Sequence, residues 1–174
     1  MNKNTALKKL NHVAWRCIDA EETRHFYEDI LGLPLAHVVT EDHVPSTGEY
    51  APYFHIFFEL GDGSYLAFFD VLDGRGATLS EDMPNWIHHF AFEVETMNDV
   101  LAMRTRLEAA GVKVIGITDH GFIQSVYFFD PNGVRLEVTT RTETKEYMDE
   151  ARKNAHGVLA TWTARKQALG VQAI

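Results

Sequence analysis

The sequence has few of the features that mark secreted, membrane or nucleic-acid-binding proteins. One cysteine, Cys17, among 174 residues excludes an internal disulfide framework. Sixteen Lys and Arg against 25 Asp and Glu give a formal net charge of −9, and no basic patch favours nucleic-acid binding. No apolar run approaches the length of a membrane span, and residues 1–9 contain no apolar signal core. We therefore expect a cytoplasmic protein that binds neither nucleic acid nor membranes.

The apolar content indicates an ordinary folded interior. Hydrophobic residues make up 45% of the chain, and 11 Phe, 6 Tyr and 3 Trp supply ample core material. Cys17 lies in an apolar stretch, so we expect a buried and unreactive thiol. The length suits one domain, or two small fused halves that share a core.

One short segment occurs twice, with a histidine at the same position in each copy. Residues 10–17 read LNHVAWRC and residues 87–94 read IHHFAFEV, which makes His12 and His89 equivalent. A lone histidine in an apolar strand is usually a core residue, but two at matched positions predict a shared ligand site. His88 must point to the opposite face of the strand from His89. We expect His88 at the surface or beside the site.

The pattern around each copy predicts the same βαβββ unit. Each unit begins with a strand–helix–strand crossover and ends in antiparallel hairpins, which gives α+β architecture. We expect the two tandem units to close a mixed sheet around a metal cavity, followed by a C-terminal helix. The expected elements are strand 10–17, helix 20–31, strand 34–40, loop 41–51 and strands 53–60 and 65–71, then strand 87–94, a helix from Thr96 to Gly111 and strands 112–117, 122–129 and 134–139. The expected divisions are an N-terminal arm (1–9), the first unit (10–71), a linker (72–85), the second unit (86–140) and a helical tail (141–174).

The tail has helical composition over residues 143–166, with an expected break at Gly157. Tyr147, Ala151, Leu159 and Trp162 fall roughly on one face. This face indicates a helix packed on the outside of the sheet or on a partner subunit, in preference to a catalytic lid.

Glu137 lies in the last strand of the second unit, among Val134, Leu136 and Val138. A buried carboxylate is costly unless it meets a cation or a metal. The pattern therefore favours Glu137 as a third ligand beside His12 and His89. The alternatives are that Glu137 faces water or pairs with Arg135 on the same face.

The repeat also predicts which residue of the first unit occupies the position equivalent to Glu137. Aligning Gly63 with Gly133 places Ala67 at the equivalent position, and alanine cannot bind a metal. Two histidines and one carboxylate with open positions are the pattern of non-haem Fe(II) oxygenases. Four protein ligands would instead suggest isomerase-type chemistry.

These units and ligands resemble the vicinal oxygen chelate superfamily over about residues 9–140. The superfamily includes glyoxalase I, extradiol ring-cleavage dioxygenases, methylmalonyl-CoA epimerase and the bleomycin- and fosfomycin-resistance proteins. Residues 118–137 (TDHGFIQSVYFFDPNGVRLE) are similar to the extradiol dioxygenase signature. The resemblance implies that His120 hydrogen-bonds the substrate or an oxygen intermediate, and that Tyr127 orients a substrate hydroxyl. Alternatively, His120 is solvated, Tyr127 is core and the Asp-Pro-Asn-Gly segment is simply a good turn.

The chain departs from the larger extradiol enzymes in two ways. First, residues 65–70 lack the acid-base histidine that those enzymes carry in this strand, and His55 or His43 are the candidates to replace it. Second, the chain has one pair of repeats, where two pairs are typical.

The leading hypothesis is an Fe(II)-dependent extradiol dioxygenase that cleaves a catechol-like aromatic ring next to the diol, using O2. Mn(II), Zn(II), Ni(II) and Co(II) are the alternative metals. Phe69, Phe122 and Phe129 are the expected walls for the aromatic substrate. The alternatives are a glyoxalase-like lyase, isomerase or epimerase on the same scaffold, against which Ala67 argues, and a metal-free small-molecule binding protein. The family resemblance also suggests a homodimer.

Overall fold

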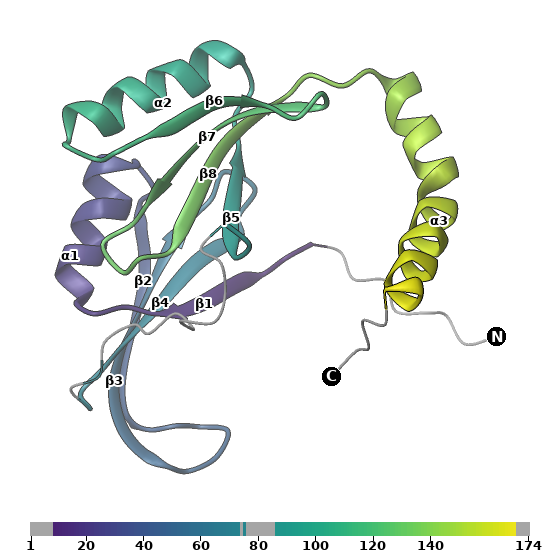
Figure 1. The fold of residues 1–174 in the computed structure, drawn as a ribbon. Coiled ribbons are helices and arrows are strands. Elements are labelled where there is room, and N and C mark those ends of the chain that lie inside the picture. Colours follow the sequence, from purple (N-terminus) through teal and green to yellow (C-terminus); the bar gives the residue numbers. More distant parts are fainter. Residues whose placement is uncertain (1–8, 74, 76–85, 170–174) are drawn as a thin grey trace.

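The computed structural model describes residues 9–73, 75 and 86–169, and most of the expected arm and linker lie outside these ranges. Two four-stranded sheets form the fold (Figure 1), with strand orders β1-β4-β3-β2 and β5-β8-β7-β6. β1 runs parallel to β4, β5 runs parallel to β8, and the other neighbours are antiparallel. The α+β fold and its tandem βαβββ units are therefore confirmed.

The element bounds follow the expected order in both units. The first unit contains β1 (His12–Arg16), α1 (Ala20–Arg24), the π-helix η1 (His25–Ile30), β2 (Leu35–His43), β3 (Tyr50–Glu59) and β4 (Tyr65–Val71). The second contains β5 (His89–Glu93), α2 (Met97–Ala109), β6 (Ile115–Asp119), β7 (Ile123–Phe129) and β8 (Arg135–Arg141). Asp19 caps α1, and Thr96 forms a reciprocal capping box with Asp99 on α2.

Several boundaries differ from the sequence prediction, most clearly in the first helix, β6 and β2. The first helix continues beyond Arg24 as a π-helix, and β6 begins at Ile115, three residues late. β2 extends to His43, into the expected loop, where it pairs with Tyr50 after a register shift. β2 is an edge strand and its last residues are exposed, so backbone pairing holds them where no apolar alternation marks a strand.

A single core runs through both units on the helix-facing side of the sheets. Tyr27 is fully buried, with its ring 4.8 Å from Phe68 and 5.2 Å from Phe58. Phe26 lies 6.3 Å from Phe128, which joins the first helix to the second sheet. Cys17 is buried in this core, and burial raises the pKa of its thiol to about 11, as expected for an unreactive cysteine.

Polar groups also join the units, at the turn between β7 and β8. The Tyr27 hydroxyl donates to the Asp130 carboxylate at 2.9 Å. The Asn132 side chain accepts from the Ile18 amide at 2.8 Å and donates to the Thr23 hydroxyl at 3.1 Å. The Asp-Pro-Asn-Gly segment is therefore a turn that also docks the second sheet onto the start of the first helix.

The tail forms one continuous helix, α3 (Lys145–Ala168), capped by Thr144. The expected break at Gly157 is wrong, because one glycine costs a helix only about 1 kcal/mol. No residue of α3 is buried, and Figure 1 shows the helix standing away from both sheets. Of the two expected positions for this helix, packing on its own sheet is not found among the described residues, and packing on a partner subunit stays a prediction. No helix in the described part of the chain is both long and apolar enough to span a membrane.

Candidate functional site

Strand register gathers polar side chains on one face of the second sheet. Glu137 of β8 lies opposite Ala91 of β5 on one side and Tyr127 of β7 on the other. Ser125, two residues before Tyr127, occupies the same face and lies opposite Thr139.

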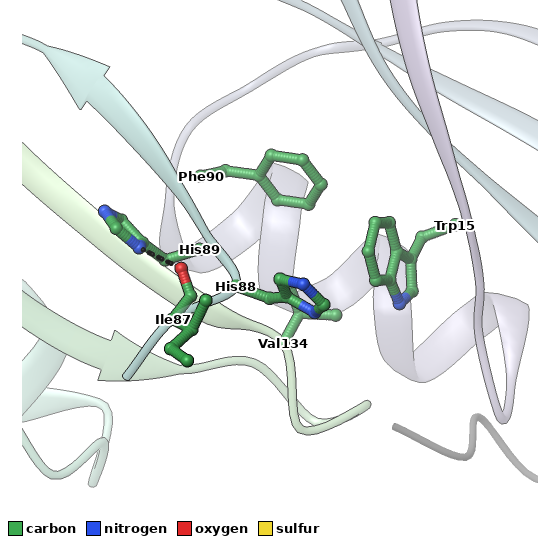
Figure 2. A pocket seen from close by; sticks show the side chains of 6 residues that line it. All are labelled: Trp15, Ile87, His88, His89, Phe90 and Val134. Carbon is green, nitrogen blue, oxygen red and sulfur yellow. Dashed lines mark hydrogen bonds between the residues drawn. The ribbon is translucent and has the colours of Figure 1, made fainter. Parts of the chain in front are cut away.

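His89 and Glu137 form the centre of this face. Their Nε2 and Oε2 atoms are 3.1 Å apart, and Glu137 is only 2% exposed. Nδ1 of His89 lies 3.1 Å from the Ile87 carbonyl (Figure 2), and a carbonyl can only accept, so Nδ1 carries a proton. Nε2 of a neutral ring then directs a lone pair at a carboxylate oxygen. A proton shared by the two atoms, or a metal ion bound by both, resolves that repulsion, so the pair can form an ion pair or supply two ligands to a divalent metal.

Hydroxyl groups support the buried carboxylate. The Ser125 hydroxyl donates to Oε1 of Glu137 and lies 2.8 Å from the Thr139 hydroxyl. Among the described residues, the ion-pair partner of Glu137 is His89, so neither alternative for Glu137, exposure to water or pairing with Arg135, holds. Sequence reasoning missed Ser125 and Thr139, although the alternation of β7 and the register with β8 contain the signal for both.

His120 and Tyr127 extend the same cluster. Nε2 of His120 is 2.7 Å from the Tyr127 hydroxyl, and the Tyr127 ring is 6.1 Å from that of His89. The Arg135 guanidinium lies 4.2 Å from the centre of the Tyr127 ring. Burial and the nearby Glu137 charge raise the pKa of Tyr127, so the phenol stays protonated and can donate a hydrogen bond.

His12 lies apart from this cluster, on β1 of the first sheet. Its Nδ1 is 2.8 Å from the Asn11 side-chain oxygen, and its ring is 5.9 Å from that of Phe57. Among residues 9–73, 75 and 86–169, no group of three or more His, Cys, Asp or Glu is placed to hold a metal. The structure thus brings together two of the three expected ligands. The centre of His12, His89 and Glu137 stays a prediction.

The asymmetry at Ala67 follows from matching registers. Ala14 pairs with Ala67 between β1 and β4, and Ala91 pairs with Glu137 between β5 and β8. Ala67 is fully buried, so the first sheet presents a methyl group where the second presents a carboxylate.

His55 of β3 is the notable titratable group of the first sheet. Its Nδ1 donates to the Phe68 carbonyl at 2.9 Å, and its ring stacks on Phe69 at 3.6 Å between centroids. Burial lowers the pKa of His55, which is 8% exposed. The ring is therefore neutral with an unprotonated Nε2. The other suggested replacement, His43, lies at the exposed end of β2 beside Tyr50.

A pocket of about 240 Å³ lies beside His89 (Figure 2). The His88 side chain points towards Trp15 in this pocket, while that of His89 points away from Trp15, as strand alternation predicts. The lining residues are Trp15, Ile87, His88, His89, Phe90 and Val134.

The three phenylalanines expected to bind substrate lie in different places. Phe69 lines a hollow with Tyr53, and Phe129 lines another with Phe26. Phe122 follows β6, is 39% exposed and accepts the Thr142 amide at its carbonyl. They do not form one wall in this structure, and their role in binding remains a prediction.

Known proteins share this organisation. A sequence profile of the Glyoxalase/Bleomycin resistance protein/Dioxygenase superfamily matches residues 9–138. An ethylmalonyl-CoA/methylmalonyl-CoA epimerase from Cereibacter sphaeroides is 32% identical over 147 residues, which cover 75% of this chain and 96% of the relative. A glyoxylase/bleomycin resistance protein/dioxygenase domain from Frankia sp. EAN1pec is 21% identical, covering 79% of this chain and all of that chain with a TM-score of 0.64. A mutant fosfomycin resistance protein from Listeria monocytogenes, complexed with Mn(II) and a dihydroxypropylphosphonic acid, is 19% identical over 82% of this chain and 98% of that chain, with a TM-score of 0.57. The profile match and the shared fold show that this chain belongs to the Glyoxalase/Bleomycin resistance protein/Dioxygenase superfamily.

Proposed function

We propose that this chain is a metal-dependent enzyme of the epimerase, isomerase or lyase class, which removes and returns a proton beside a carbonyl group. The observation that carries the proposal is the buried Glu137 carboxylate, 3.1 Å from His89 and held by the Ser125 hydroxyl. The 32% identity to a curated epimerase over three quarters of this chain favours this class over ring cleavage.

The proposed roles follow from the chemistry of each group. His89 and Glu137 hold the metal, with His12 as the third ligand. A bound divalent ion supplies Lewis-acid chemistry by polarising a substrate carbonyl. His55 exchanges the proton through Nε2, because its Nδ1–H is fixed on the Phe68 carbonyl and its lowered pKa keeps the ring neutral. Tyr127 donates a hydrogen bond from a phenol whose raised pKa keeps it protonated.

The proposed substrate is an acyl thioester that also carries a free carboxylate, of the kind named for the Cereibacter sphaeroides relative. Arg135 supports this choice because it lies at the site, over the Tyr127 ring, and has no carboxylate partner among the described residues. A guanidinium placed in this way can bind a substrate carboxylate through two parallel hydrogen bonds.

The test is exchange of the C2 proton of methylmalonyl-CoA or ethylmalonyl-CoA in deuterated water, followed by NMR with Co(II)- or Mn(II)-loaded protein. We expect exchange with the native chain and none with His89→Ala, while Glu93→Gln, an exposed substitution on the same strand, serves as the matched control. No exchange by native protein with confirmed bound metal would remove the proton-transfer proposal.

Extradiol ring cleavage is the second candidate. Two observations favour it: the methyl group of Ala67 at the position equivalent to Glu137, which leaves one protein ligand fewer, and the His120–Tyr127 contact at 2.7 Å. Its test is oxygen uptake, with a coloured ring-cleavage product, when anaerobically Fe(II)-loaded protein meets a panel of catechols. Oxygen uptake without C2 exchange would assign the chain to this class instead.

A further inference from the structure

α3 is an amphipathic helix that buries none of its residues against the described part of the chain. None of its residues is buried, and a row of large apolar side chains is exposed. The exposed fractions are 49% for Tyr147, 67% for Val158, 60% for Leu159 and 55% for Trp162. Single exposed apolar residues are normal, but a row of them on a helix without a buried residue marks a contact surface.

Val158 and Trp162 lie on a line of positions with the spacing of a coiled-coil seam, and Tyr147 and Leu159 flank that line. Seam positions recur at alternating intervals of three and four residues, the heptad repeat that lets two helices supercoil. At 24 residues, α3 is about 36 Å long and holds about three heptads. The seam residues are Met148, Ala151, Ala155, Val158, Trp162 and Arg165.

The sizes of the seam residues select the partner and its direction. The small residues Ala151 and Ala155 lie in the first half, while Val158 and Trp162 lie in the second. A second α3 in the antiparallel direction places Trp162 against Ala151 and Val158 against Ala155. A parallel copy would set Trp162 against Trp162 and leave a void between two alanines. Gly157 lies beside the centre of the antiparallel pair, and no atom outside its own helix crowds it.

Charge favours the same surface. Residues 145–150 carry three acidic side chains and one basic one, whereas the last turn carries Arg165 and Lys166, so an antiparallel copy places the basic end of one helix beside the acidic end of the other. We propose that two copies of this protein associate through antiparallel pairing of their α3 helices. The interface is isologous, since the same seam serves both copies.

The test is sedimentation velocity on the full chain over a micromolar concentration series. We expect a dimer for the native protein. For Trp162→Ala we expect a dimer Kd at least about thirtyfold higher, because a central tryptophan is a typical hot spot. Ala151→Trp should weaken the dimer as well, by placing two tryptophans at one layer. Lys153→Ala, on the face away from the seam, is the matched control and should leave the dimer unchanged.

The double variant Ala151→Trp/Trp162→Ala separates the antiparallel arrangement from a merely damaged helix. It exchanges the large and small residues of one layer, so antiparallel pairing should return. A monomeric native chain, a dimer insensitive to Trp162→Ala, or a double variant that remains monomeric overturns the proposal. Binding of a monomeric native chain to vesicles of anionic phospholipid would overturn it in favour of a membrane surface.

Discussion

Replacing Tyr27 with Phe tests whether the polar link between the two units stabilises the fold. The Tyr27 hydroxyl is fully buried and donates to the Asp130 carboxylate at 2.9 Å, across 103 residues of sequence. Tyr27→Phe keeps the ring against Phe58 and Phe68 and removes only the oxygen. A hydrogen bond to a charged acceptor contributes about 1.5–3 kcal/mol. For a chain of this size, a loss of about 2 kcal/mol lowers Tm by roughly 4–8 °C.

The other hydrogen bonds of Asp130 limit the free energy that Tyr27→Phe should lose. Its Oδ1 accepts the amides of Asn132 and Val134 at 2.9 and 2.7 Å, and its Oδ2 keeps the Asn132 side-chain amide at 3.1 Å. The Asp130 carboxylate therefore keeps these three hydrogen bonds in Tyr27→Phe, and we expect the free energy of unfolding to fall by about 2 kcal/mol rather than 3.

The loss of stability in Tyr27→Phe should depend on pH, because the substitution changes the pKa of Asp130. Burial raises the pKa of Asp130, while the Tyr27 hydrogen bond opposes that rise. A raised carboxyl pKa stabilises the fold below the ordinary Asp pKa, and that contribution is lost as pH rises through the folded-state pKa. Without the Tyr27 hydroxyl the Asp130 pKa rises further, so the loss in Tyr27→Phe should be largest at neutral pH and shrink as the acid protonates.

The measurement is urea unfolding of native protein and Tyr27→Phe at neutral and mildly acidic pH. Tyr50→Phe is the matched control, because Tyr50 is 69% exposed and its substitution should change the free energy of unfolding by less than about 0.5 kcal/mol. Equal effects for the two variants, or a loss in Tyr27→Phe that grows on acidification, would refute the reasoning.

Three further predictions concern the second sheet and the proposed proton-transfer group. Glu137→Gln should abolish binding of Co(II) or Mn(II) in calorimetric titration, because it removes the carboxylate beside His89, and unchanged affinity would exclude Glu137 as a ligand. Ser125→Ala should weaken metal affinity by roughly 10- to 100-fold, the usual effect of losing a group that positions a ligand; an unchanged titration would deny that role. His55→Gln should slow C2-proton exchange by about 10²- to 10⁴-fold with metal affinity unchanged, whereas His43→Gln should exchange normally. Since the His55 pKa is lowered, native exchange should persist at pH values below the ordinary histidine pKa, and loss of exchange above that value would contradict the assignment.

Local patterns were enough to predict the elements and their order. Strand alternation, the caps Asp19 and Thr96 and the matched segments around His12 and His89 are properties of neighbouring residues. The same repeat predicted that Ala67 occupies the position equivalent to Glu137, since equivalent units share a register. Where backbone pairing alone holds a strand, as at the polar end of β2, no local pattern predicted it.

The relations between distant surfaces could not be predicted in the same way. Docking of Asn132 on the Thr23 hydroxyl joins residues from different units, and nothing in either segment names its partner. The separation of His12 from His89 depends on how two sheets without shared ladder bonds lie against each other. Ser125 was overlooked because a hydroxyl in an apolar strand has no pattern of its own until the register with β8 is known.

The methyl group of Ala67, where the second sheet has Glu137, makes the two sheets chemically different. The second sheet supplies a negative charge and hydroxyl groups at Glu137, Ser125 and Thr139, whereas the first supplies aromatic surface and one neutral imidazole at His55. A ligand that turned end for end would meet a different chemistry at each of its ends. One side-chain difference between two equivalent positions is therefore sufficient to give the site a direction, which fixes the end of a ligand that meets each sheet.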